Sequence, residues 1–147
     1  MKVKMALLSV MAVASMVVTL LALSADGISK ASPDGEVGQV DIDASYNGQG
    51  IEIDACKSLV ITLASNPATG FRWELAGPID ENLLALIGTR YEPGADAEVG
   101  LVGAGGTEIW TFETLTDGET TITMEYSRPW DGGEKAVETF EVTVTIK

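Results

Sequence analysis

From about residue 39 onward, the sequence is divided into short segments in which apolar and polar residues alternate. Clear examples are "SLVITLA" (58–64), "TEIWTFETL" (107–115), "TTITMEYS" (120–127) and "ETFEVTVTIK" (138–147). Alternation with a period of two places successive side chains on opposite faces of a β-strand, and Val, Ile, Thr and aromatic residues favour strands. Such segments bury their apolar faces by packing one sheet against another, so the pattern predicts an all-β fold.

The alternating segments predict about seven strands. We expect them at 39–54 (broken), 58–64, 71–76, 84–91, 107–115, 119–127 and 137–146. Short strands at roughly ten-residue spacing, separated by turn signals, are typical of an immunoglobulin-like antiparallel β-sandwich. Trp73 and Trp110 lie within the strand patterns and are predicted to be core residues. The stretch "ENLLALIG" (81–88) is either a helical turn or the beginning of a strand that reaches Tyr91.

Cysteine and histidine usage limits the chemistry of the chain. Cys56 is the single cysteine, so no internal disulfide can form, and we predict a small buried side chain at this position. The sequence has no histidine, so Ser-His-Asp and Cys-His nucleophilic sites and the usual imidazole zinc sites cannot be assembled. We therefore expect a protein that is not an enzyme and that holds no cofactor and no metal.

The N-terminus has the layout of a secretory signal. Lys2 and Lys4 precede an uncharged, mostly apolar run from Met5 to Leu23, which the small residues Ser24 and Ala25 close. The run approaches the length that spans a bilayer, so an uncleaved N-terminal anchor is the alternative for residues 1–25. Residues 26–38 are polar and aperiodic and are predicted to be a flexible tether. The domain proper, 39–147, is expected to be secreted, periplasmic or displayed at the cell surface.

The charge of the chain excludes several partners. It carries 9 basic and 22 acidic residues and a formal charge of −13. Without residues 1–25, which hold two lysines and no acid, that charge falls from −13 to −15. Nucleic acid and anionic membrane surfaces repel such a protein, so the N-terminal anchor is the one membrane contact we consider.

Three turn regions contain more Gly and Pro than a simple reversal requires. They are "SNPATG" (65–70), "GLVGAGG" (100–106) and "SRPWDGG" (127–133). Because each connection in an antiparallel sandwich reverses the chain, the connections after the strands at 58–64, 84–91 and 119–127 emerge at the same end. The alternation of chain direction therefore predicts that these three regions lie together.

Each region alone has an ordinary structural explanation. In "NPATG", Pro67 fixes φ and Gly70 can adopt a positive φ, which makes a rigid tip of small residues or simply a good turn. "GAGG" (103–106) is a flexible spacer or a backbone that approaches a partner closely. Trp130 follows Pro129, where the strand pattern ends, and an aromatic residue beside Arg128 is typical of a binding hot spot. The alternative for Trp130 is a side chain folded back onto its own domain.

The motifs "SNPATGF-W", "GAGGTE" and "YSRPW", in this order and at these separations, resemble those of the chagasin family. The resemblance covers roughly residues 38–147. This family consists of secreted or lysosomal protein inhibitors of papain-family cysteine peptidases. It has an immunoglobulin-like fold and uses three loops together to fill the catalytic cleft. The resemblance therefore implies a reversible, competitive, tight-binding inhibitor, expected to act as a monomer.

The resemblance also implies a role for each motif. The first loop would enter the catalytic cleft, with Thr69 close to the catalytic cysteine of the enzyme, and the other two would contact its rims. The implied peptidase-binding residues are Asn66, Pro67, Ala68, Thr69, Gly70 and Phe71, then Gly103, Ala104, Gly105 and Gly106, then Arg128, Pro129 and Trp130. The family commonly has "NPTTG" where this chain has Ala68. We expect some loss of affinity, because a missing hydrogen bond typically costs about 0.5–1.5 kcal/mol.

Two other functions are compatible with the residues. The main alternative is a non-inhibitory extracellular immunoglobulin-like module whose loop end recognises another protein or a glycan. A small carboxylate hydrolase is the second, but the three turn motifs contain no acid pair, only the single carboxylate of Asp131. Incubation with papain and a fluorogenic peptide distinguishes these alternatives from the inhibitor.

Overall fold

The computed structural model describes residues 38–98, 100 and 102–147, and these residues form eight strands and three short helices. The strands are β1 (Gln39–Asp43), β2 (Gln49–Ile53), β3 (Ser58–Ser65), β4 (Arg72–Leu75), β5 (Leu84–Pro93), β6 (Gly106–Thr114), β7 (Gly118–Ser127) and β8 (Glu138–Ile146). The helices are the 3-10 turns η1 (Ala44–Tyr46) and η2 (Pro67–Thr69) and the single-turn α1 (Ala95–Glu98). No helix in these described ranges has the length and apolar character needed to cross a membrane.

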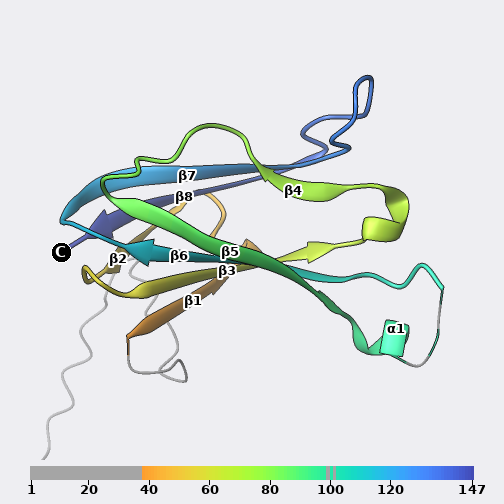
Figure 1. The fold of residues 1–147 in the computed structure, drawn as a ribbon, viewed down its shortest axis with the longest axis horizontal. Helices are drawn as coiled ribbons and strands as arrows, with labels where there is room; N and C mark the ends of the chain where they lie inside the picture. The colour runs from red at the N-terminus through yellow and green to blue at the C-terminus, as the bar shows by residue number, and fades with distance from the viewer. Residues whose placement is uncertain (1–37, 99, 101) are drawn as a thin grey trace, which may run out of the picture.

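The strands form two four-stranded sheets that pack face to face (Figure 1). One sheet has the order β1-β3-β6-β5 and the other the order β2-β8-β7-β4. The predicted all-β sandwich is confirmed. The stretch at 81–88 is resolved in favour of the strand, because β5 begins at Leu84 after a turn and continues to Pro93.

The expected broken strand at 39–54 consists of two strands that belong to different sheets. Asp43 accepts a hydrogen bond from the Ser45 amide, and Gly48 has a φ of 75°, so the chain turns between β1 and β2. As a result β1 pairs in parallel with β3, and β2 pairs in parallel with β8, while the remaining pairs are antiparallel. The two parallel pairs lie at sheet edges, where this crossing segment adds one strand to each sheet.

The core lies between the two sheets and follows the alternation of the sequence. The inward positions of β3 and β6 and those of β7 and β8 supply fully buried side chains, including Leu59, Ile61, Phe112, Ile122, Met124, Val142 and Val144. Trp73 and Trp110 belong to this cluster at 6% and 8% exposure, which confirms both as core residues. Burial of this apolar area is the main stabilising contribution to a domain without a disulfide.

The prediction of a buried Cys56 is wrong. Its side chain is exposed and its backbone has a φ of 59°, within the corner between β2 and β3 (residues 54–57). The corner is held by backbone groups, since the Cys56 amide donates to the Thr114 carbonyl at 2.8 Å. The Cys56 side chain therefore points away from the core, although its backbone amide is hydrogen-bonded to β6. The predicted signal or anchor, 1–25, and nearly all of the predicted tether, 26–38, lie outside the described residues.

The connections after β3, β5 and β7 emerge at the same end of the sandwich, at the right of Figure 1. They are the β3–β4 loop (66–71), the β5–β6 loop (94–105) and the β7–β8 loop (128–137). The β2–β3 corner and the C-terminus lie at the other end. This arrangement agrees with the alternating chain direction, because β3, β5 and β7 all run toward the loops.

Candidate functional site

The tip of the β3–β4 loop is a single 3-10 turn whose shape is set by its own residues. The Asn66 side chain caps η2 by accepting from the Ala68 amide at 3.2 Å, and Pro67 occupies the first helical position. Gly70 ends the turn in the left-handed region, with a φ of 83° and its amide donating to the Pro67 carbonyl at 2.9 Å. Thr69 donates its hydroxyl to the Asn66 carbonyl at 2.6 Å. The tip therefore has a defined conformation while Pro67, Ala68 and Thr69 remain exposed.

The stems of this loop belong to different sheets, because β3 lies in one and β4 in the other. Two hydrogen bonds cross between the sheets beneath the tip. The Asn66 amide donates to the Tyr126 hydroxyl at 2.7 Å, and the Trp73 indole nitrogen donates to the Ala64 carbonyl at 2.9 Å. These contacts hold the loop on the end of the sandwich without a backbone ladder between its stems.

The Glu108 carboxylate also connects the two stems. Its Oε1 accepts from the Ser65 hydroxyl at 2.6 Å, and its two oxygens accept from the Trp73 amide at 3.3 and 3.2 Å. Sequence reasoning did not assign a role to Glu108, although a signal was present. Its register in β6 is that of Trp110 and Phe112, which face the core, and a charged residue in an apolar row requires partners.

The β5–β6 loop is bonded directly to the β3–β4 loop. The Asn66 side-chain amide donates to the Gly103 carbonyl at 2.9 Å, so the residue that caps η2 also holds the glycine-rich segment. A Cβ at Gly105 would lie 3.2 Å from the Ser65 carbonyl oxygen, and one at Gly106 would collide with the carbonyl of Glu92. Gly105 and Gly106 therefore allow the segment to pack closely against Ser65 and Glu92 of the same chain, and the approach of a partner to "GAGG" stays a prediction.

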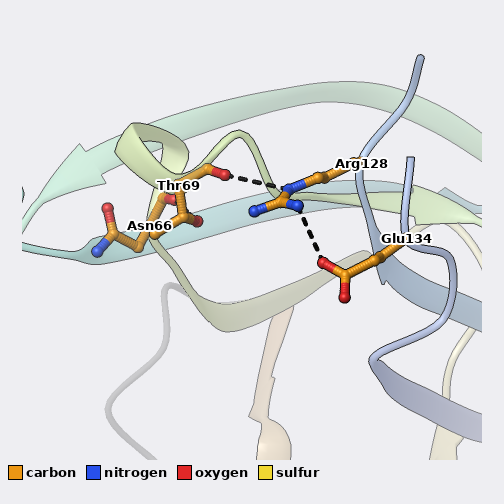
Figure 2. A network of polar contacts seen from close by, with 4 residues as sticks. All are labelled: Asn66, Thr69, Arg128 and Glu134. Carbon is orange, nitrogen blue, oxygen red and sulfur yellow. Dashed lines mark hydrogen bonds and ion pairs between the residues drawn. The ribbon is translucent and has the colours of Figure 1, made fainter. Parts of the chain in front are cut away.

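Arg128 fastens the β7–β8 loop to the β3–β4 loop from the other side (Figure 2). Its Nε donates to the Thr69 carbonyl at 3.3 Å, and its Nη1 donates to Glu134 at 3.0 Å. The Arg128 amide also donates to the Glu134 carbonyl at 2.8 Å, which closes the β7–β8 loop across its base. Glu134 was not among the predicted site residues, because its ion pair with Arg128 forms only when the β7–β8 loop folds.

Trp130 packs on the neighbouring loop and remains half exposed. A Cβ at Gly70 would collide with Cη2 of the Trp130 ring, so the indole lies directly against this glycine. The Arg128 guanidinium is 5.9 Å from the Trp130 ring centroid and 4.4 Å from that of Phe71, and Phe71 stacks on Tyr126. Trp130 retains 51% exposure, so it is ordered by contacts while it presents much of its ring to solvent. Trp130 is therefore neither a fully protruding side chain nor one that is buried on its own domain, the two alternatives drawn from the sequence.

The structure thus brings the three predicted motifs together at one end. Direct bonds or packing link Asn66, Thr69, Gly70, Phe71, Gly103, Gly105, Arg128 and Trp130 across the loops. The other predicted residues lie in the same loops or at their margins: Pro67 and Ala68 at the tip, Ala104 and Gly106 in the glycine-rich segment, and Pro129 beside Trp130. Within the described ranges, no three Cys, Asp or Glu side chains gather where they could hold a metal ion.

The chain is similar to known peptidase inhibitors. A family model described as "Chagasin family peptidase inhibitor I42" matches residues 52–144. Chagasin from Trypanosoma cruzi is 32% identical over 101 residues, which are 67% of this chain and 89% of chagasin.

Two solved structures share the fold. The cysteine protease inhibitor EhICP2 from Entamoeba histolytica superposes with a TM-score of 0.60 at 21% identity, over 74% of this chain and 95% of EhICP2. PbICP-C, solved in complex with falcipain-2, superposes with a TM-score of 0.51 at 18% identity, over 82% of this chain and 96% of that one.

Proposed function

The chain belongs to the chagasin family of peptidase inhibitors, and on this premise we propose that it inhibits papain-like cysteine peptidases by filling their catalytic cleft. The similar structures support this class of target, since one is named a cysteine protease inhibitor and another was solved in complex with falcipain-2. Inhibition is reversible and competitive in this proposal, because the loops and the substrate occupy the same space. No covalent step is involved, so the absence of histidine is no obstacle.

The observation that carries the proposal is the position of the β3–β4 loop between two loops that are each bonded to it. Asn66 donates to Gly103 on one side, and Thr69 accepts from Arg128 on the other. A loop that is already ordered loses little conformational entropy when it binds, so more of the contact energy is retained as affinity. A narrow tip with small side chains fits a cleft between two walls, and the flanking loops meet those walls.

The tip residues define what the loop can offer to the catalytic centre. The Thr69 hydroxyl already donates to the Asn66 carbonyl, so its oxygen is left to accept a hydrogen bond from the peptidase. Ala68 adds no hydrogen-bonding side chain, and its amide is used by Asn66. The tip therefore fills the cleft mainly by shape, and we expect the affinity to come largely from the flanking loops.

The flanking loops supply different kinds of surface. Gly103, Ala104, Gly105 and Gly106 form a backbone-rich rim on one side, where a peptidase wall can approach closely. Arg128, Pro129 and Trp130 form the other rim, and the half-exposed indole of Trp130 provides a large apolar contact. Buried aromatic residues of this kind supply much of the binding energy in protein complexes.

Steady-state kinetics with the purified protein tests the proposal. We expect reversible inhibition of papain and of cathepsin L-like peptidases that rising substrate concentration relieves, and no inhibition of a serine peptidase. Inhibition that substrate does not relieve would contradict occupation of the cleft. Absence of inhibition across the panel would leave the non-inhibitory recognition module as the better account.

We also propose that the protein acts outside the cytoplasm, on the basis of the signal-like residues 1–25. Lys2 and Lys4 followed by the apolar run to Leu23 support export. Cell fractionation with N-terminal sequencing of the recovered protein tests this. A mature chain that begins near residue 26 indicates a cleaved signal, whereas an intact membrane-bound chain indicates an anchor.

A further inference from the structure

The β3–β4 loop lacks the backbone hydrogen bonds between its two stems that hold an ordinary hairpin in place. In a hairpin the two stems pair with each other, but here β3 pairs with β1 and β6, and β4 pairs with β7. The stems share no ladder because they lie in different sheets. Their separation, and with it the angle at which the tip stands, depends on side chains that cross between the sheets.

Glu108 provides a charged link at this position. Its carboxylate receives the hydroxyl of Ser65, the last residue of β3, and the amide of Trp73, the second residue of β4. One carboxylate therefore bonds both stems of the loop, beside the Trp73 indole, which bonds the Ala64 carbonyl. Hydrogen bonds to an ionised acceptor are about twice as strong as neutral ones, and partial burial strengthens them further.

Glu108 also joins the loop to the strand that follows the glycine-rich segment. It lies two residues after Gly106, where β6 begins, and Gly106 pairs with Ser65. Asn66, which follows Ser65 in the chain, donates its side-chain amide to the Gly103 carbonyl. The carboxylate thus lies where two of the three loops leave the sandwich. Both carboxylate oxygens accept hydrogen bonds beneath the tip, so in the proposed complex the loops contact the peptidase and Glu108 does not.

We propose that Glu108 is the positioning residue of the inhibitory β3–β4 loop, an inference that rests on the proposed function. It acts by fixing the separation of the two stems, and with it the angle at which the tip enters the cleft, and it makes no contact with the peptidase. Loss of the carboxylate lowers the fraction of molecules with a competent loop, and the apparent dissociation constant rises in proportion. The loss therefore falls on the association rate constant, whereas removal of a contacting residue acts mainly on dissociation.

The kinetic test compares Glu108→Ala and Glu108→Gln with Glu113→Ala in the full-length protein. Glu113 is an exposed residue of the same strand and serves as the matched control. We expect Glu108→Ala to raise the inhibition constant for papain about 10- to 100-fold, mainly through slower association. Glu108→Gln keeps one acceptor oxygen and is expected to restore the constant to within about 2- to 10-fold of the parent. Glu113→Ala is expected to leave it unchanged.

Amide hydrogen exchange of the free protein tests the same proposal without a peptidase. We expect Glu108→Ala to speed exchange at Trp73, which loses its acceptor, and at Asn66, whose amide bonds the Tyr126 hydroxyl across the base of the loop, while Ile122 and Val142 in the core keep their protection. Uniformly faster exchange would show a merely structural role and would overturn the proposal. Unchanged exchange at Asn66 would also overturn it, as would a loss of affinity that lies only in dissociation.

The two measurements separate failure of this inference from failure of the proposed function. If the parent protein does not inhibit papain, the function fails, and hydrogen exchange still decides whether Glu108 positions the loop. If the parent inhibits and both Glu108 variants match it in association rate and in exchange, the positioning role is wrong while the function stands. Should Glu108→Ala not fold, Glu108→Gln carries both measurements with smaller expected effects.

Discussion

The β3–β4 loop and the β2–β3 corner lie at opposite ends of the same strand, and both are fixed by several hydrogen bonds. At the corner, the Thr114 hydroxyl from β6 accepts from the Lys57 amide at 3.0 Å and donates its one proton to the Asp54 carbonyl at 2.8 Å, while the Thr114 amide donates to the Lys57 carbonyl at 2.9 Å. The Ala55 amide donates to the backbone carbonyl of Lys147 at 2.9 Å. Several hydrogen bonds thus hold the corner as well as the loop, so an ordered turn does not by itself identify a binding site.

The two regions differ in what fastens them and in what remains exposed. The corner is fastened by the core, since Thr114 is fully buried and its hydroxyl is satisfied inside. The β3–β4 loop is fastened partly by its neighbouring loops, through Asn66 and Arg128, and Trp130 packs beside it at 51% exposure. A surface that is ordered by other loops and still exposes an aromatic ring is prepared to contact a partner. The comparison therefore predicts that substitutions at one end change inhibition and those at the other change stability.

The largest effect on inhibition is expected from Trp130→Ala. Removal of a large aromatic contact at an interface costs about 2–4 kcal/mol, a weakening of about 30- to 1000-fold. The fold should be nearly unaffected because Trp130 is half exposed and lies outside the core cluster. Inhibition constants and thermal unfolding of the same samples measure the two effects.

Trp110→Ala is the matched control for Trp130→Ala. Trp110 is 8% exposed in the core cluster, so its truncation is expected to cost about 3–5 kcal/mol of unfolding free energy. The folded fraction should still inhibit. A Trp130→Ala protein that melts early yet inhibits normally would place this residue with the core and contradict the comparison.

Thr114→Val is expected to produce the opposite result from Trp130→Ala. Valine keeps the shape of threonine but leaves the Lys57 amide and the Asp54 carbonyl without their side-chain partner, which costs about 1–3 kcal/mol of stability. The inhibition constant should stay the same at a temperature where the variant is folded. Chemical denaturation gives the first quantity and peptidase kinetics the second.

Thr121→Val, on the exposed face of β7, is the control for Thr114→Val and is expected to change stability by less than about 0.5 kcal/mol. If Thr114→Val weakened inhibition as strongly as it lowered stability, the two ends of the sandwich would be coupled. The division between a structural end and a binding end would then be wrong.

Cys56→Ser is expected to have the smallest effect. The side chain is exposed, and the corner is held through its backbone amide, which serine retains. Stability should change by less than about 0.5 kcal/mol, and inhibition should not change. Denaturation and inhibition assays in the presence and absence of a reducing agent measure this. A large loss of affinity with the fold preserved would assign the corner to the binding surface.

The candidate site was predictable from the sequence to the extent that it depends on turn residues and strand order. Pro67 and Gly70 do set the shape of η2, and the alternating chain direction did place three loops together. The bond between Asn66 and Gly103 and that between Arg128 and Thr69 were not predictable, because they join residues 37 and 59 positions apart. Such contacts depend on how the two sheets pack, which no local pattern specifies.

The sequence alone determined most of the strands and which of their side chains face the core, because the period of two assigns faces within each strand, but it left 81–88 open between a helical turn and a strand. Only the tertiary structure decided which sheet each strand joins. It divided 39–54 into β1 and β2 with parallel partners, and it turned the Cys56 side chain to the surface. It also placed Glu108 between Ser65 and Trp73. The physical reason is that alternation is a property of one strand, whereas sheet membership and hydrogen bonds between loops arise when two sheets pack together.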